Sequence, residues 1–371
     1  MATNQMGRGI ALACQGGGSH TAFTAGVLTE LLANDDRDIR ALSGTSGGAV
    51  CAFLAWSGLL LGGRRGRSVG VARLEQYWER LQTQGLVETL QDAIALDTLR
   101  VIGRLGFVLE FSPYLNIFEA SRDFRKLLDD IVRFDQTSIP STAPRLLISA
   151  AEVRTGEFRI FRSHEIDEEP ADGMTSEVLL ASAAVPTLFR AVHRGNNIYW
   201  DGLFAQNPPV RDLPDAARGE GEDGSPPDEL WVVMINPMRQ QGEPKRMDDI
   251  RDRRNELAAN ISLQQEIHFI GKINELAIRD LLAGEAKAKY HPIKVRAIAM
   301  SDEMGASLDY ESKLSRNPSQ VRSLMEHGRE QARTFLADLE GPDADDRTAI
   351  TSRDIWGRRK DRSWTPLQTK V

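Results

Sequence analysis

Residues 41–50 read Ala-Leu-Ser-Gly-Thr-Ser-Gly-Gly-Ala-Val, which places Ser46 on a sharp turn between two apolar segments. Gly44 and Gly48 stand two residues away on each side, and an apolar run over residues 51–56 follows. G-x-S-x-G between a short strand and a buried helix is typical of a nucleophile elbow, a strained turn that lifts the serine hydroxyl above the positive end of the helix. The pattern predicts that Ser46 is a nucleophile, although a glycine-rich turn can also serve packing alone.

A second glycine-rich turn comes earlier in the chain. Residues 9–14 are short and apolar, which predicts a buried strand, and Gly16, Gly17 and Gly18 follow almost directly. Such a turn leaves backbone N–H groups unshielded and can bind an anion or a developing oxyanion. A dinucleotide-binding fingerprint is the competing interpretation, but Thr21 stands where its third glycine is required.

The order of the segments predicts an α/β fold. Residues 39–43 form a second strand, so two strands each end in a glycine turn that opens a helix. Both turns are then expected at the carboxyl edge of one sheet, where α/β folds place their sites. Further strands are predicted at 144–151, 158–161, 198–200, 229–236 and 294–300, and further helices at 178–185, 248–282 and 318–339.

Two regions carry weaker patterns. Residues 62–135 are predicted to be mostly helical, either as a layer packed on the sheet or as an insertion that serves as a lid or lipid contact. From residue 341 the chain is charged and aperiodic, which predicts a flexible tail. We therefore expect one domain over residues 1–340 and a C-terminal tail over 341–371.

Composition limits the classes of function. The 371 residues are 41% hydrophobic and 27% charged, as in globular proteins, and the net charge of -7 disfavours nucleic-acid binding. The two cysteines have no C-x-x-C spacing, which fits a reducing compartment. The N-terminus shows no signal-peptide pattern, and no apolar run reaches the length of about 18 residues that a membrane span needs. A cytoplasmic protein is predicted, with peripheral membrane contact possible and the oligomeric state undetermined.

An Asp-Gly pair ends another predicted strand. Asp201 and Gly202 follow residues 198–200 directly. A carboxylate at a strand end can point into the crevice of an α/β sheet, although Asp-Gly is also a common plain turn.

Taken together, the glycine loop, the elbow around Ser46 and Asp201-Gly202 resemble the patatin-like phospholipase family. Proteins of that family carry these three motifs in the same order along the chain. Similar stretches also occur at residues 21–28, 182–189 and 207–209, so the resemblance covers residues 9–240. It implies a three-layer sandwich in which a central, mostly parallel sheet is flanked by helices.

The resemblance also implies a mechanism without metal or organic cofactor. Asp201 would take the proton of Ser46 while the serine oxygen attacks an acyl ester of a lipid. The oxyanion would rest in the loop of Gly16, Gly17 and Gly18, on the N–H groups of the last two. Because a carboxylate with a pKa of ~3.9 is a poor base for a hydroxyl, such a dyad requires burial that raises the basicity of the aspartate.

The sequence departs from the family pattern beside the oxyanion loop. His20 occupies a position that is usually Arg or Lys, which makes it a candidate substrate contact or a plain polar loop residue. A Ser-His-Asp site is an alternative, but His268, His291 and His327 lie in contexts that carry no catalytic signal.

The leading functional hypothesis is a phospholipase A or lysophospholipase. A general carboxylesterase is the close alternative. A non-catalytic lipid-binding module on the same scaffold is the alternative from another class, and the presence of both Ser46 and Asp201 disfavours it.

Overall fold

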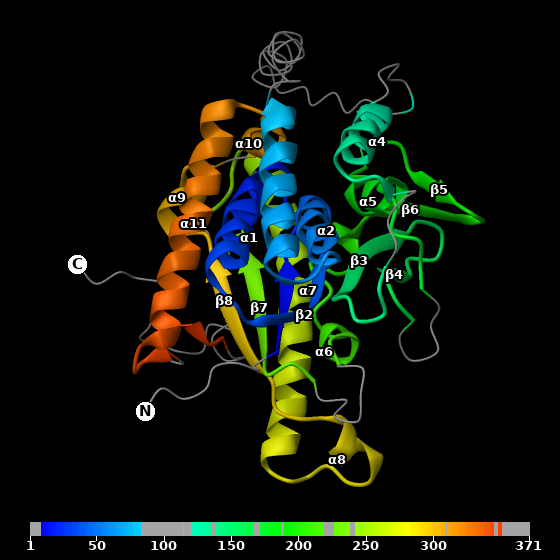
Figure 1. Cartoon of the computed structure of the whole chain (residues 1–371). Helices are drawn as coiled ribbons and strands as arrows, with labels where there is room; N and C mark the ends of the chain where they lie inside the picture. The colour runs from blue at the N-terminus through cyan, green and yellow to red at the C-terminus, as the bar shows by residue number, and fades with distance from the viewer. Residues whose placement is uncertain are drawn as a thin grey trace.

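A computed structural model describes residues 9–82, 114, 120–134, 139–165, 171–186, 189–218, 226–237, 242–308, 310–344 and 348–350 of the chain. Figure 1 shows a central sheet covered by helices in front and behind. The described residues form eight strands, which are β1 Gly9–Cys14, β2 Asp38–Gly44, β3 Arg145–Glu152, β4 Phe158–Arg162, β5 Val192–Arg194, β6 Asn197–Asp201, β7 Glu229–Met234 and β8 Lys294–Ala299.

The sheet is mixed and mostly parallel. Its order is β5-β6-β3-β2-β1-β7-β8, with β4 paired to β3 outside this path. The neighbours from β3 to β8 are parallel, whereas β4 and β6 run antiparallel to β3, and β5 runs antiparallel to β6. This arrangement confirms the predicted α/β class.

The helices join these strands or follow them. They are α1 Ala22–Asn34, α2 Gly47–Leu59, α4 Ala120–Ile131, α5 Ser176–Ala183, α6 Leu213–Ala216, α7 Met247–Ile278, α8 Glu285–Lys289, α9 Asp302–Ala306, α10 Tyr310–Leu314 and α11 Pro318–Glu340, with short 3-10 turns η1 Gly18–Thr21 and η4 Gly202–Phe204. Residues 63–82 are helical as well. Within the described ranges, none of these helices has both the length and the hydropathy required to cross a bilayer.

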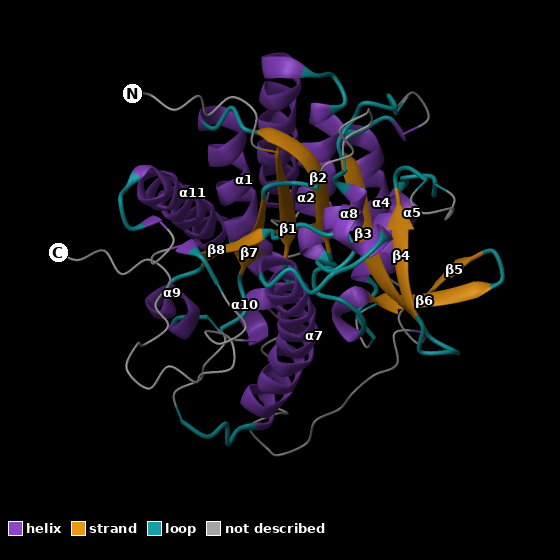
Figure 2. Cartoon of the chain, turned by 90° about the horizontal axis from the view of Figure 1, so that it is seen from below, coloured by secondary structure: helices purple, strands orange, loops and turns teal. Residues whose placement is uncertain are grey.

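The two faces of the sheet carry separate hydrophobic clusters. Along β1, Ile10, Leu12 and Cys14 join the cluster that includes α1, α2 and α11. Ala11 and Ala13, which alternate with them, join the cluster that includes α6 and α7. Figure 2 shows α1, α2 and α11 on one side of the strands and α7 on the other. The sheet is therefore the middle of three layers.

β3 has three neighbouring strands, and two of them share one edge. β2 pairs with Arg145–Ile148 of β3, β6 with Ala150–Glu152, and β4 with Leu147–Ala151. Because β4 overlaps both other stretches and a strand has only two edges, β2 and β6 lie one after the other on the edge opposite β4. They approach from opposite directions, so their ends, Gly44 and Asp201, face each other.

Two of the predicted regions are described only in part. Helix 63–82 and α4 agree with the helical character expected over 62–135, the region considered as a lid or a packed layer, while residues 83–113, 115–119 and 135 lie outside the described residues. Within the predicted tail, Ala349 forms a β-bridge with Arg296 of β8, and the Ile350 side chain is buried. Residues 348–350 are thus packed against the sheet, and residues 351–371 lie outside the described part.

Candidate active site

The turn between β2 and α2 has the geometry of a nucleophile elbow. Ser46 has φ 55° and ψ −129°, a region that residues with a side chain rarely adopt. A Cβ on Gly48 would lie 2.4 Å from the Cys14 carbonyl oxygen, and one on Gly44 would lie 2.6 Å from the Ala49 Cα. Both flanking positions therefore require glycine because the helix, the turn and β1 are in close contact.

The glycine loop after β1 packs directly on this elbow. A Cβ on Gly16 would lie 2.9 Å from the Ser46 Cβ. The Gly16 N–H donates to Asn207 Oδ1 at 2.6 Å, so this donor is already engaged. In the described part of the chain, the N–H groups of Gly17 and Gly18 donate to no protein acceptor. Of the three glycines predicted to form the oxyanion hole, Gly17 and Gly18 retain available donors and Gly16 anchors the loop.

Asp201 ends β6 in a buried position, and the residue is 1% exposed. Oδ1 accepts a hydrogen bond from Leu203 N at 2.7 Å, whereas Oδ2 is buried and has no partner among the described residues. Burial raises the pKa of the carboxyl to about 7, and the Leu203 N–H and the Ser46 hydroxyl partly oppose this rise.

The Ser46 hydroxyl is thus near enough to influence Asp201 electrostatically. Oδ2 of Asp201 has no hydrogen-bond partner among the described residues, and the hydrogen bond that Oδ1 accepts comes from Leu203 N. Hydrogen bonds between catalytic groups are often long in unliganded enzymes and tighten when substrate binds. The geometry brings together a strained serine and a carboxylate of raised basicity.

Close packing against β3 explains why a glycine, Gly202, follows the aspartate. A Cβ at this position would lie 2.2 Å from Ser149 Oγ and 2.6 Å from the Ser149 carbonyl oxygen, both on β3. The Asp201 N–H donates to the carbonyl oxygen of Ala184, the residue that caps the C-terminal end of α5, at 3.0 Å, which ties the strand end to that cap. The Asp-Gly pair therefore meets a steric requirement beyond that of a plain turn.

Several polar residues that support the site were not singled out from the sequence. Ser182 Oγ accepts from Ser46 N at 2.9 Å, and Asn236 Nδ2 donates to the Gly16 carbonyl oxygen at 3.1 Å. Gln15 Oε1 accepts from Asn236 N at 3.0 Å. Ser182 and Asn207 occur in stretches that carry the family resemblance, which was the signal available for them. Gln15 and Asn236 gave no signal because their partners come from distant parts of the chain.

His20 is a buried residue that binds the protein itself. It is 4% exposed, and its Nε2 lies 2.8 Å from Ser312 Oγ. Burial lowers its pKa to about 3, and the nearby charge of Lys313 adds to the effect. His20 is therefore neutral near pH 7 and does not supply the cation that the family usually has there. The structure shows it bound to α10, and its predicted role as a substrate contact gains no support.

The described residues place no histidine where a Ser-His-Asp site would need one. All six histidines lie in described ranges, and none of them hydrogen-bonds to Ser46 or Asp201. His327 Nε2 instead accepts from Ser301 N at 3.2 Å. The described residues also contain no cluster of three or more His, Cys, Asp or Glu side chains that could hold a metal ion.

Comparison with known proteins identifies a family over the first part of the chain. The family model described as patatin-like phospholipase matches residues 12–214, a range that includes the glycine loop, Ser46 and Asp201. None of the curated proteins matches the chain.

Solved structures give distant similarities. The crystal structure of VipD from Legionella pneumophila is 14% identical, with a TM-score of 0.38 over 89% of this chain and 66% of that chain. The type III effector protein ExoU is 13% identical, with a TM-score of 0.34 over 87% of this chain and 52% of that chain. The chain thus spans just under two thirds of VipD and about half of ExoU.

Proposed function

The chain belongs to the patatin-like phospholipase family, and from this premise we propose that it is a serine acyl hydrolase of lipid esters in which Ser46 is the nucleophile and Asp201 the base. The observation that carries the proposal is the pairing of a strained serine with a buried carboxyl whose pKa is about 7. A base of this pKa is ionised in a large fraction of molecules at neutral pH and still accepts a proton readily.

The proposed reaction has two steps. Asp201 takes the hydroxyl proton while Ser46 Oγ attacks the ester carbonyl, and the N–H groups of Gly17 and Gly18 stabilise the oxyanion. Each such donor contributes on the order of 3 kcal/mol to transition-state stabilisation. As the tetrahedral intermediate collapses, the protonated Asp201 gives the proton to the leaving oxygen, so that the alcohol departs, an acyl-serine remains and Asp201 is ionised again. Asp201 then activates a water molecule, which releases the fatty acid and restores Ser46.

The substrates we propose are phospholipids or lysophospholipids. The lipid ester class follows from the family, and the phosphate-bearing substrates are the finer part of the proposal. A small-ester carboxylesterase and a lipid-binding module without activity are the alternatives against which it is tested.

The test combines active-site labelling with product release. We expect a fluorophosphonate to form one adduct, mapped to Ser46 by mass spectrometry, and mixed phospholipid vesicles to release fatty acid. Ser46→Ala should lose both signals. Asp201→Asn should lose turnover while its circular dichroism spectrum stays that of the wild type.

Each other result has a defined meaning. Labelling without release from vesicles, together with hydrolysis of a short soluble ester, would favour the carboxylesterase. Absence of labelling would favour the binding module, and full activity in Asp201→Asn would refute the dyad.

A further inference from the structure

Glu266 on α7 holds the segment that follows the Asp201 turn. Its Oε1 accepts from Gln206 Nε2 at 2.5 Å, and its Oε2 accepts from the N–H groups of Val210 and Arg211 at 2.6 and 2.9 Å. One buried carboxylate therefore binds both ends of segment 206–211. The helix that supplies it lies beyond the residues that match the family model.

The held segment contacts the elbow and the neighbouring strand. The Gln206 carbonyl oxygen accepts from Thr45 Oγ1, next to the proposed nucleophile, and from Ser149 Oγ, both at 2.6 Å. Ser43 Oγ on β2 donates to the Pro209 carbonyl oxygen at 2.6 Å. These contacts tie the segment to the backbone on which Ser46 is carried.

The same segment clamps the glycine loop. The Asn207 side chain accepts from Gly16 N at 2.6 Å through Oδ1 and donates to the Gly16 carbonyl oxygen at 3.4 Å through Nδ2. The Asn207 N–H donates to Ser262 Oγ at 3.1 Å, one turn before Glu266 on α7. A displacement of segment 206–211 would therefore move Gly16, and with it the N–H groups of Gly17 and Gly18.

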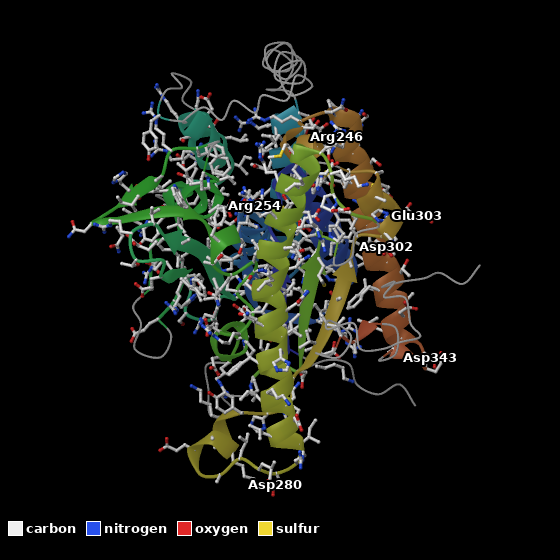
Figure 3. All side chains as sticks on the ribbon, turned by 180° about the vertical axis from the view of Figure 1, so that it is seen from behind. Arg246, Arg254, Asp280, Asp302, Glu303 and Asp343 are labelled. Atoms are coloured by element: carbon white, nitrogen blue, oxygen red, sulfur yellow. The ribbon has the colours of Figure 1, made fainter. Side chains whose placement is uncertain are left out.

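We propose that Glu266 is a positioning residue, which sets the geometry of the oxyanion loop and the elbow by holding segment 206–211 in place. The inference rests on the proposed function. A displacement of about 1 Å from a change remote from the chemistry can cost on the order of 10²-fold in rate. Figure 3 shows α7 lying over one face of the sheet, with Arg246 at one end and Asp280 near the other, so that one long continuous helix carries this carboxylate.

The contacts separate positioning from a chemical role. Among the described residues, Glu266 accepts three hydrogen bonds, all from segment 206–211, and none involves Ser46 or Asp201. Gln206 Oε1 is buried without a partner in the described part of the chain. If Glu266 became glutamine, a flip of the Gln206 amide would present this oxygen to the new NH2 group, and every hydrogen bond would be kept.

The proposal therefore predicts different effects on kcat for two variants at this position. Glu266→Gln removes the charge and keeps the clamp, so we expect kcat for a soluble ester to stay within about 3-fold of wild type. Glu266→Ala removes the clamp, so we expect kcat to fall on the order of 10²-fold with little change in KM. The same order of loss is expected in the rate of fluorophosphonate labelling of Ser46.

Asn274→Ala is the matched control on the same helix. Asn274 clamps Ile293 by two hydrogen bonds, to its carbonyl oxygen at 2.8 Å and from its N–H at 3.0 Å, about two turns beyond Glu266 toward the C-terminal end of α7. This variant should lower the unfolding temperature as Glu266→Ala does and leave kcat unchanged. A loss of kcat in both variants would show a general effect of stability and overturn the proposal.

A readout that needs no activity completes the experiment. Hydrogen exchange measured by mass spectrometry should rise over residues 15–21 in Glu266→Ala and stay at the wild-type level in Glu266→Gln and Asn274→Ala. Unchanged exchange in Glu266→Ala would refute the inference. Equal damage from Glu266→Gln and Glu266→Ala would refute it too, because the charge would then matter. A wild-type protein that neither labels nor hydrolyses esters would refute the proposed function, while the exchange data would still decide the inference.

Discussion

At the scale of single residues, the ionisation of Asp201 should govern the pH dependence of the reaction. The carboxyl must be ionised to accept the Ser46 proton, and its pKa is about 7. We expect kcat/KM for an uncharged ester to rise about tenfold per pH unit below this pKa and to level off above it. A pH profile from about pH 5 to about pH 9 measures this directly.

His20 provides the control for that profile. Its pKa of about 3 keeps it neutral across the whole range, so His20→Gln should keep the midpoint of the wild type. A midpoint that moved in this variant would assign the titration to the histidine. A profile that stayed flat down to about pH 5 would contradict the raised pKa of Asp201.

The residues that the sequence predicted and those that it missed differ in their range of interaction. Ser46 and Asp201 stand in local patterns, a glycine elbow and an Asp-Gly pair. Each pattern spans no more than five consecutive residues, so it can be recognised from the sequence alone. Glu266 and Asn207 act on partners 55 or more positions away in sequence. Burial and neighbours decide their roles, and neither is encoded in the adjacent residues. The neutral state of His20 was missed for the same reason.

At the scale of elements, the approach of α2 to β1 should be intolerant of added volume. A Cβ on Gly48 would lie 2.4 and 2.5 Å from the carbonyl oxygens of Cys14 and Gln15, which are backbone atoms that cannot turn away. We expect Gly48→Ala to lower the free energy of unfolding by about 3 kcal/mol. Urea denaturation followed by circular dichroism measures the change.

Gly305→Ala is the comparison for that experiment. Gly305 lies in α9, and a Cβ there would have no heavy atom within 4 Å. Alanine favours a helix over glycine by up to about 1 kcal/mol, so this variant should be neutral or slightly stabilising. Equal stability of Gly48→Ala and the wild type would show that the elbow has room to adjust.

The ends of elements were predicted less well than their presence. β1 and β7 are short and mostly apolar, which the sequence identifies because central parallel strands are buried on both faces. α5 ends at Ala183, two residues before the predicted end, because the residue before Pro186 is disfavoured in a helix. β5 has only three residues and depends on pairing with β6, so no local pattern announced it.

At the scale of the whole molecule, the candidate site draws on chain beyond the family match. The match ends at residue 214. Beyond it, β7 pairs with the edge of β1 that lies opposite β2, and α7 covers one face of the sheet. Gln15 accepts from the Ile235 N–H at 2.9 Å, which links the glycine loop to the end of β7. We therefore propose that residues on both sides of this limit form one folding unit.

The buried Asp201 should make the free energy of unfolding of the whole chain fall as pH rises. Its pKa is about 7 in the folded state and 3.8 in an exposed reference state, so the folded protein binds more protons between these values. The contribution of Asp201 to the free energy of unfolding is therefore fully present below about pH 4. It is lost as pH rises to about 7, and the loss amounts to about 4 kcal/mol.

Asp201→Asn removes this ionisation and keeps an oxygen for the Leu203 N–H. We expect the variant to unfold with a free energy up to about 4 kcal/mol above the wild type at about pH 8, and with nearly the same value at about pH 4. Urea denaturation of both proteins at the two pH values tests this, and the difference between proteins cancels the other titrating groups. An equal difference at both pH values would mean that the carboxyl is not strongly desolvated. The expected difference, near zero at about pH 4 and up to about 4 kcal/mol at about pH 8, would instead show that the site holds a costly charge for the sake of its basicity, since the variant that gains stability is the one that loses the base.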